Sequence, residues 1–485
     1  MNSLYNDVLV KIQLNDLLTE IFGSSKNFSI VKSNENTIKV VRLSDQKSIL
    51  IRYPGNFCST KRSSWFSCVR REILETFYKT IHPEQVYSSD DNNEITWIIS
   101  FKKSFNLCKC SLPKCVKLKY TYTPFFNCIC CVGTEKNICE LRDKIPEIEF
   151  ITPDIKVESA EIGNRTVIQS MQSVGDFIKR IGAIRSSQKS GDGTGSLENR
   201  SDINVFIVDT GISRHPDLNI VSGINFTSNN PNDWEDRNGH GTHVSGIVGA
   251  RDNNFGVVGV APGVRLWAIK VLGDDGNGTL SKIILGLKWI LKNKGKLWNG
   301  YGIINMSLGS RASWAFDVAI DTLIDHGMIP VVAAGNQSID AFYVSPARVS
   351  CAITVGATTT IPSYNSSSYY NTLAWFSNYG RLVDILAPGV NIPSTFLNGG
   401  YATLSGTSMA AAVVTGTVAL MLSSQHVTGT NTSKFVENVR NKLVSDSAII
   451  QNKYADGNFG FNPRIIIPTP KNETTTNISV WAGRY

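Results

Sequence analysis

The pattern of apolar and polar positions predicts different secondary structure in different parts of the chain. A continuous apolar run from Val205 to Val208 is typical of a buried strand in a parallel sheet. The apolar stretch from Met409 to Leu422 predicts a buried helix that begins near Ser408. The segment from His240 to Ala250 carries small residues at close intervals, which suits a helix packed tightly against its neighbours. The back part of the chain therefore combines strands and helices.

The front third of the chain shows weaker patterns. Residues 95–101 and 147–154 predict strands, residues 124–127 are expected to open a further strand, and residues 140–146 predict a helix end. Residues 1–93 mix helical periodicity over 9–22 with strand-like runs at 37–42 and 48–53. This N-terminal segment matches no familiar pattern and could serve in targeting or interaction.

Composition narrows the class of protein. The 485 residues are 42% hydrophobic and 18% charged, which suits a soluble protein of about two or three domains. No run of about 18 apolar residues occurs, so we expect no membrane span. The net charge of +8 is spread without a basic run, which argues against nucleic-acid binding. The first residues lack a signal-peptide pattern, which favours an intracellular or particle-packaged protein (virion or granule) over classical secretion.

Four short motifs supply an acid, a base, an amide donor and a nucleophile. Asp209 ends the apolar run and precedes Thr-Gly, at the strand end where α/β sheets place their chemistry. His240 opens a His-Gly-Thr-His motif, Asn336 ends Ala-Ala-Gly-Asn, and Ser408 lies in Gly-Thr-Ser-Met-Ala. A serine hydroxyl needs an adjacent base, and histidine suits that role near neutral pH. A carboxylate can fix the histidine tautomer, and an amide donor can stabilise an oxyanion.

In this chain order, the four motifs resemble those of the subtilisin-like serine proteases, nearest to the proteinase K type. The resemblance implies a subtilisin-like three-layer α/β domain with a central parallel sheet. It implies that Ser408 attacks a peptide carbonyl, that His240 relays the proton and that Asp209 orients His240. Asn336 and the Ser408 backbone N–H would form the oxyanion hole. His243, the second histidine of its motif, would be a buried structural residue.

The same resemblance implies how a polypeptide substrate would bind. The substrate would lie as an added strand between two glycine-bearing edges, for which ordinary loop glycines are the alternative interpretation. The expected substrate-binding residues are Gly276, Asn277, Gly278, Leu280, Ser307, Leu308 and Gly309, with Ala333, Ala334 and Gly335 as one wall of the first pocket. No acidic residue lies in that wall. We therefore expect broad specificity, or cleavage after apolar or aromatic residues.

Residues 94–158 resemble the propeptide inhibitor of the same family, a ferredoxin-like α+β domain, although an unrelated α+β module is the alternative. We expect residues 154–159 to run through the cleft, with self-cleavage between Ser159 and Ser170. The protein would be a monomer whose own propeptide is an intramolecular inhibitor. The expected order is an unassigned segment (1–93), the propeptide-like domain (94–158), a processing linker (159–200), the catalytic domain (201–467) and a C-terminal tail (468–485).

Further features leave alternatives open. The resemblance suggests structural calcium with Asp384 as its carboxylate, although calcium takes several oxygen ligands and the pattern supplies one carboxylate. Catalysis itself would need no cofactor. Ala412 stands where the family usually has proline, and alanine is a good helix former, so we expect retained chemistry. A catalytically inactive binding protein and a peptide ligase that uses the same acyl-enzyme are the competing functions.

The cysteines gather at the front of the chain. Cys351 is the one cysteine in the expected catalytic domain, and seven cysteines cluster between Cys108 and Cys139. Their spacing lacks the paired C-x2-C of zinc modules. Packed free thiols, disulfides and metal ligands are the three interpretations. The first is favoured because Cys128, Cys130 and Cys131 fall on an expected strand, where a small buried hydrophobe fits.

Overall fold

The computed structural model describes residues 28–34, 37–42, 48–52, 94–102, 105, 107, 112–161, 172–362, 369–425, 427, 429 and 432–447.

The chain divides into two compact units, residues 1–90 and 91–485. The first contains an antiparallel sheet of β1 (Phe28–Asn34), β2 (Thr37–Arg42) and β3 (Ser48–Arg52) in that order. The strands predicted at 37–42 and 48–53 are therefore confirmed. The helical periodicity over 9–22 lies outside the described residues.

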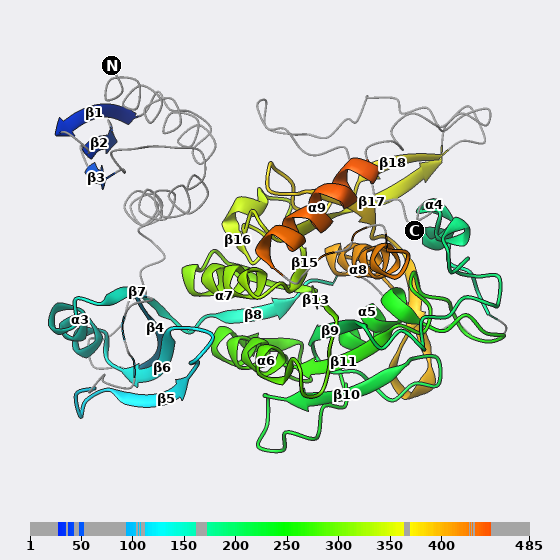
Figure 1. Cartoon of the computed structure of the whole chain (residues 1–485), viewed down its shortest axis with the longest axis horizontal. Coiled ribbons are helices and arrows are strands. Elements are labelled where there is room, and N and C mark those ends of the chain that lie inside the picture. Colours follow the sequence, from blue (N-terminus) through cyan, green and yellow to red (C-terminus); the bar gives the residue numbers. More distant parts are fainter. Residues whose placement is uncertain are drawn as a thin grey trace. The chain divides into compact units, whose positions relative to one another are not determined.

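A central sheet organises the second unit (Figure 1). Its strands are β9 (Ile203–Asp209), β10 (Ile220–Asn225), β11 (Arg265–Lys270), β13 (Tyr301–Met306), β15 (Ile329–Ala333), β17 (Ile353–Pro362), β18 (Tyr369–Leu373) and β19 (Ile385–Pro388). They follow the order β10-β11-β9-β13-β15-β17, and both β18 and β19 pair with β17. Among these described strands, all pairs are parallel except β17–β18. Every residue of β9 is buried, as its apolar run predicts.

Helices pack on this sheet in two groups. The helices are α4 (Asp176–Arg180), α5 (His240–Gly249), α6 (Leu280–Asn293), α7 (Trp314–Asp325), α8 (Thr407–Ser423) and α9 (Ser433–Ser447). α5 packs against α8, which contacts β13, β15 and β17, whereas α6 packs against α7, which contacts β15 and α9. All of α8 is buried, as expected of a helix without a polar face. The domain is thus the α/β fold with a central parallel sheet that the sequence predicts.

Short elements complete this domain. They are a hairpin of β20 (Ile392–Thr395) and β21 (Tyr401–Leu404), and the 3₁₀ turns η3 (Ala183–Arg185), η4 (Ala341–Tyr343) and η5 (Leu397–Gly399). None of the helices in the described ranges combines the length and the apolarity that a membrane span requires.

A smaller antiparallel sheet lies ahead of the central one in sequence. It has the order β5-β6-β4-β7, formed by β4 (Ile95–Phe101), β5 (Lys117–Thr121), β6 (Cys128–Gly133) and β7 (Ile148–Pro153), with helix α3 (Glu135–Lys144). The predicted strands at 95–101 and 147–154 and the helix end near 144 are confirmed. Residues 124–127 form a turn, and the strand begins only at Cys128. β5 was not predicted, because its exposed Lys-Leu-Lys sequence shows no buried face.

The two faces of β6 pack against different cores. Cys128 and Cys130 belong to the large core that includes the central sheet. Ile129 and Cys131 belong to a separate small core with Trp97 and other residues of this sheet and of α3. Cys128, Cys130 and Cys131 are buried thiols that form no disulfide, as the favoured interpretation predicts, whereas the thiols of Cys115 and Cys351 are exposed. Residues 108 and 110 lie outside the described ranges.

Strand β8 (Lys156–Ser159) connects the two sheets. It enters a separate four-stranded sheet of order β12-β8-β14-β16, with β12 (Asn277–Thr279), β14 (Leu308–Arg311) and β16 (Val344–Ser345). In Figure 1, β8 runs as a cyan arrow from the small sheet towards the central domain, between α6 and α7. The chain thereby passes directly into the region where the predicted site residues gather.

Candidate active site

The ends of three adjacent strands bring the predicted site residues to one edge of the central sheet. β13 lies between β9 and β15, so the three parallel strands end side by side. Asp209 is the last residue of β9, Ser307 follows β13, and residues 334–336 follow β15. The carboxyl ends of parallel strands form the usual binding edge of such sheets. This edge is therefore the candidate active site.

Asp209 and His240 form a buried pair at this edge. His240 Nδ1 lies 2.7 Å from Asp209 Oδ1, and both side chains are fully buried. The same carboxylate oxygen accepts the backbone N–H of Thr210 at 2.7 Å, which fixes the carboxylate on the strand end. A carboxylate at Nδ1 selects the tautomer whose Nε2 can accept a proton. His240 Nε2 has no hydrogen-bond partner among the described residues.

Asp236 fixes the first turn of α5, and sequence reasoning missed it. Its Oδ1 accepts the backbone N–H groups of Asn238 and Gly239 at 3.0 and 2.9 Å. Its Oδ2 accepts the N–H and the hydroxyl of Thr242 at 2.9 and 2.6 Å. A carboxylate at a helix N-terminus satisfies backbone donors that lack helical partners. Asp236 thereby holds the turn that carries His240, and its position just before the histidine motif was the available signal.

The two histidines of α5 have opposite pKa shifts. Burial disfavours the charged form of His240, but Asp209, then Glu161 and Asp236, outweigh it and raise the pKa of His240 to about 9. Burial, with a smaller effect of the His240 charge, lowers the pKa of His243 to about 3. His243 Nε2 lies 3.1 Å from the carbonyl oxygen of Ala402. His243 is therefore a neutral structural residue, whereas His240 lies in a strongly negative environment.

Ser408, the second residue of α8, contacts a carbonyl of its own chain. Its hydroxyl donates to the Ala160 carbonyl oxygen, and its backbone N–H points at the same oxygen over 3.4 Å. Ser408 Oγ also lies 3.2 Å from the carbonyl oxygen of Ser307. The Ser307 hydroxyl donates to the Ser408 carbonyl oxygen at 3.0 Å, which ties α8 to the end of β13. The serine hydroxyl therefore lies against an amide carbonyl.

Thr407 orients the amide of Asn336, a contact that the motif alone did not reveal. The Thr407 N–H and hydroxyl donate to Asn336 Oδ1 at 2.9 and 2.8 Å. Because both contacts use the oxygen, the Asn336 amino group points elsewhere. That group is buried and has no partner within the described ranges. Asn336 Nδ2 is thus a buried donor of the kind that an oxyanion could accept.

β8 occupies the cleft as the central strand between two edges. β12 pairs with one side of β8 and β14 with the other, both antiparallel. The predicted binding residues that make these pairs are Asn277, Gly278, Leu308 and Gly309. Peptides commonly bind proteases in this way, as an added strand with backbone hydrogen bonds. The chain's own β8 therefore lies between the two edges where the sequence predicts a substrate strand.

The backbone just before the Ala160 carbonyl is held by both edges of the cleft. The Ala160 N–H donates to the Ser307 carbonyl oxygen at 3.1 Å, and the preceding Ser159 N–H donates to the Gly276 carbonyl oxygen at 3.2 Å. A Cβ at Gly406 would lie 2.5 Å from the Ala160 carbonyl oxygen. Only glycine permits this close approach, because a Cβ would collide with the carbonyl.

The other predicted binding residues surround this cleft less directly. Leu280 opens α6 and is fully buried, and its N–H donates to the backbone just before β8 at 3.1 Å. Ala333 ends β15 and Ala334 follows, both buried. Gly335 adopts φ +104°, and a Cβ there would lie 2.3 Å from Asn378 Nδ2. Asn378, which sequence reasoning missed, donates to the Ala334 carbonyl oxygen at 2.8 Å and shapes this loop.

A second contact joins the small sheet to the central domain. Asp154 accepts the backbone N–H and the hydroxyl of Ser281 at 2.8 and 2.6 Å. Ser281 is the second residue of α6, so this carboxylate lies at a helix N-terminus, where negative charge is favoured. Tyr122 donates to the Ser281 carbonyl oxygen at 3.3 Å, and Lys288 donates to that of Thr121 at 2.8 Å. Burial raises the pKa of Asp154, although the bonds from Ser281 oppose the shift.

The surroundings of Asp384 do not fit the expected calcium ligand. Its Oδ1 pairs with the guanidinium of Arg440 on α9, and its Oδ2 accepts the Thr354 N–H at 2.9 Å. Burial raises the pKa of Asp384, with Arg440 opposing. A guanidinium on the carboxylate would repel a calcium ion, which requires several oxygen ligands. Among the residues that the structure describes, no group of three His, Cys, Asp or Glu side chains could hold a metal.

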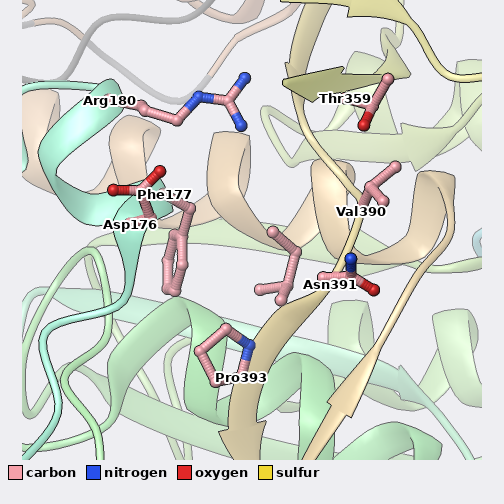
Figure 2. A pocket seen from close by; sticks show the side chains of 8 residues that line it. Asp176, Phe177, Arg180, Thr359, Val390, Asn391 and Pro393 are labelled. Carbon is pink, nitrogen blue, oxygen red and sulfur yellow. The ribbon is translucent and has the colours of Figure 1, made fainter. Parts of the chain in front are cut away.

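A separate pocket lies beside α4. Figure 2 shows it between α4 and the segment that leads into β20, with a volume of about 210 Å³. Its lining residues are Asp176, Phe177, Arg180, Thr359, Val390, Asn391, Ile392 and Pro393. None of them belongs to the predicted site. The cleft beside Ser408 is not hollow, because β8 and Ala160 fill it.

Comparison with known proteins relates this geometry to a family. Residues 200–461 match the family described as the subtilase family, peptidase S8. Subtilisin BL of Lederbergia lenta is 43% identical over 222 residues, which cover 46% of this chain and 76% of that protein. The alkaline protease of Shouchella clausii is 39% identical over 277 residues, 57% of this chain and 64% of that protein.

Two further proteins are similar to this chain. Subtilisin E of Bacillus subtilis is 38% identical over 262 residues, 53% of this chain and 63% of that protein. The crystal structure of a cold adapted subtilisin-like serine proteinase aligns with a TM-score of 0.45 and 36% identity, over 52% of this chain and 85% of that chain.

Proposed function

The chain belongs to the subtilase family of serine endopeptidases, and on that premise we propose that it is a zymogen that cleaves itself between Ala160 and Glu161. The released enzyme then hydrolyses peptide bonds of other polypeptides through an acyl-enzyme on Ser408. One observation carries the proposal. The Ala160 carbonyl oxygen faces both the hydroxyl and the backbone N–H of Ser408.

In the proposed reaction, Ser408 already contacts this carbonyl and His240 serves as the base. Ser408 Oγ bonds to the Ala160 carbonyl carbon while His240 Nε2 takes the hydroxyl proton. The Ser408 N–H and Asn336 Nδ2 stabilise the negative oxygen of the tetrahedral intermediate. The C–N bond to the next residue breaks, and its amine takes the proton from His240. Water then hydrolyses the ester by the same proton route, with Asp209 orienting the histidine.

Tethering favours the first cut within one molecule. β8 is already paired on both edges, so the Ala160 carbonyl need not be captured from solution. A well-oriented intramolecular group has an effective concentration on the order of 10⁵ M or more. The position after β8 agrees with the linker in which the sequence predicts processing. Cleavage by a second copy would be slower, because that copy's own β8 fills its cleft.

We further propose that the segment up to Ala160 remains bound as an inhibitor after cleavage. The support is that β8 keeps its pairing and Asp154 keeps its contacts with Ser281, none of which involves the broken bond. One chain supplies the proposed acid, base and nucleophile (Asp209, His240 and Ser408), the oxyanion donors and both edges of the cleft. A monomer therefore suffices for activity. Assignment to the proteinase K type rests on the four motifs alone.

Specificity follows from the wall of the first pocket. Ala333 and Ala334 are buried and apolar, and no carboxylate lies in that segment. We propose broad cleavage with a preference for apolar or aromatic residues before the broken bond. The alanine at position 160 fits such a site without filling it. A peptide library that showed strict cleavage after Arg or Lys would refute this preference.

An active-site probe tests the peptidase function. A fluorophosphonate should label Ser408 of the purified, processed protein, because the probe needs the same activated hydroxyl. The matched His240→Ala protein should fail to label. A processed and folded wild-type protein that does not label would show that the chain is a binding protein without catalytic activity. Aminolysis that outruns hydrolysis when an amine acceptor is added would instead indicate a ligase.

A further inference from the structure

Glu161, the residue after Ala160, carries a carboxylate into the catalytic centre. Its Cα would lie 3.2 Å from a Cβ on Gly406, so the backbone passes directly over the turn before Ser408. One carboxylate oxygen, Oε2, is buried and accepts no hydrogen bond from any described residue. Buried carboxylates are normally hydrogen-bonded, because an unpaired buried charge is costly. A carboxylate with one such oxygen beside a reactive serine therefore points to an electrostatic partner.

Among the described residues, His240 forms an ion pair with Asp209 and none with Glu161, so the Glu161 carboxylate acts on His240 through space. His240 Nε2 is also buried and without a hydrogen-bond partner in the described ranges, and the Glu161 carboxylate favours its protonated form. Three other titratable groups face His240: Asp209 from β9, Asp236 from the segment before α5, and the neutral His243 from α5 itself. The two aspartates stay in place after cleavage. Glu161 alone becomes a chain terminus and is free to leave.

We propose that Glu161 is an electrostatic inhibitor of the first cleavage: while it is joined to Ala160, its carboxylate holds His240 as an imidazolium, which cannot accept the Ser408 proton. This inference rests on the self-cleavage proposed above and adds a regulation of the same site. Cleavage breaks the bond that holds Glu161 in place and so removes the inhibitory charge. The enzyme that results acts on later substrates with a histidine that is more often neutral.

The contacts of Ser408 agree with a protonated His240. Its hydroxyl donates to the Ala160 carbonyl oxygen rather than to His240 Nε2. A protonated Nε2 is a donor and cannot receive that hydroxyl proton. The serine is therefore beside its target and lacks an available base. Only molecules with a neutral His240 can cleave, and below the pKa that fraction falls about tenfold for each pH unit.

The negative charge of Glu161 determines in which direction, and by how much, the pH midpoint of self-cleavage should shift. An opposite charge raises the pKa of a histidine, by about 1–3 units when it lies within about 4–6 Å and by less when it lies farther away. Because Asp209 and Asp236 remain, we expect loss of the Glu161 charge to lower the midpoint of self-cleavage by about one pH unit. Below that midpoint, the first cut should then be about tenfold faster at a given pH. The released enzyme should likewise hydrolyse peptides with a lower midpoint than that of its own first cut.

The experiment measures the first-order rate of the 160–161 cut in the full-length chain, after a jump from mildly acidic solution to a series of pH values. Glu161→Gln removes the charge, and Glu161→Asp retains it. Glu140→Gln is the matched control, because Glu140 is an exposed residue of α3 paired with Lys144 at 3.6 Å. The same preparations are then assayed for peptide hydrolysis after processing is complete.

The expected result is a midpoint about one unit lower for Glu161→Gln, and midpoints near that of the wild type for Glu161→Asp and Glu140→Gln. All four released enzymes should share one pH profile for peptide hydrolysis. An unchanged midpoint in Glu161→Gln would overturn the inference while leaving self-cleavage intact. Equal shifts in self-cleavage and in peptide hydrolysis would also overturn it, because Glu161 would then act through the folded enzyme. A wild-type chain that never makes a Ser408-dependent cut would overturn both proposals.

Discussion

The catalytic domain and the small domain before it carry their functional information in different ways. In the catalytic domain, the proposed function depends on single atoms: His240 Nδ1 contacts Asp209, and the Asn336 amide is oriented through its oxygen. In the small domain, the apolar face of β6 and the path of β8 matter instead. Short sequence motifs thus determine the catalytic centre, whereas the position of an apolar surface determines how the small domain packs. Substitutions in the two regions should differ accordingly in size and kind.

Loss of the base should have the largest effect. In His240→Ala, no group remains to take the Ser408 proton, so kcat for peptide hydrolysis should fall about 10⁶-fold, the effect known for the related subtilisins. The enzyme for this assay is obtained by cutting the linker with an added protease. His243→Gln is the control, because His243 is neutral and makes only a structural contact. A His240→Ala enzyme with more than one per cent of wild-type kcat would contradict the assignment.

Loss of the oxyanion donor should have a smaller effect on the same step. Asn336→Ala should lower kcat about 10²–10³-fold with little change in KM, as for the corresponding donor in the related subtilisins. Thr407→Val removes one of the two bonds that orient the amide, so it should cost about tenfold. Steady-state kinetics of the processed enzymes measures both. Equal losses in the two variants would show that Asn336 acts through folding rather than through its amino group.

The sequence predicted the strand that ends at Asp209 and the helix around Ser408 well because the signals for both are local. Asp209 ends an apolar run, and Ser408 precedes an apolar helix, so both positions follow from their immediate neighbours. Ala160 could be placed only within a stretch of about a dozen residues, because the strand register of β8 depends on β12 and β14 more than a hundred residues away. The prediction that Asp384 binds calcium is wrong for the same reason, a contact distant in sequence, because Arg440 of α9 pairs with this carboxylate.

Long-range packing also explains what sequence reasoning missed in the small domain. Alternation along β6 shows that its residues face two sides, but not that one side packs against the catalytic domain. Asp154 gives no sign in sequence that it will meet the N-terminus of α6. Thr407 belongs to a recognised motif, whereas Asn378 was missed, and the hydrogen bonds of both to residues 334–336 became visible only in three dimensions.

A change at the docking contact should affect inhibition and leave catalysis intact. Asp154→Ala removes a carboxylate that accepts two hydrogen bonds from Ser281, which contribute about 1.5–3 kcal/mol when charged. Peptide hydrolysis should therefore begin about ten- to a hundredfold sooner after the first cut, with unchanged kcat. Ser281→Ala loses only the hydroxyl bond and should shorten this lag less. A lag that is unchanged in Asp154→Ala would mean that β8 alone holds the small domain.

The smallest effect concerns the thiols on the two faces of β6. In full-length Ser408→Ala, Cys128, Cys130 and Cys131 should react slowly with an alkylating agent, since they are buried and burial raises the pKa of Cys130 to about 12. Cys115 and Cys351 are exposed and should react first. Peptide mapping by mass spectrometry separates the sites. Rapid labelling of Cys130 in the folded chain would contradict the docking of this face.

The most direct test of the account compares purified wild type with Ser408→Ala and sequences the new N-terminus. The wild-type chain should split into two pieces, and the larger piece should begin at Glu161. The Ser408→Ala chain should remain at 53.2 kDa under the same conditions. A wild-type cut at another bond would contradict the placement of Ala160 at the serine. A Ser408→Ala chain that is still cut in the absence of other proteases would contradict self-cleavage itself.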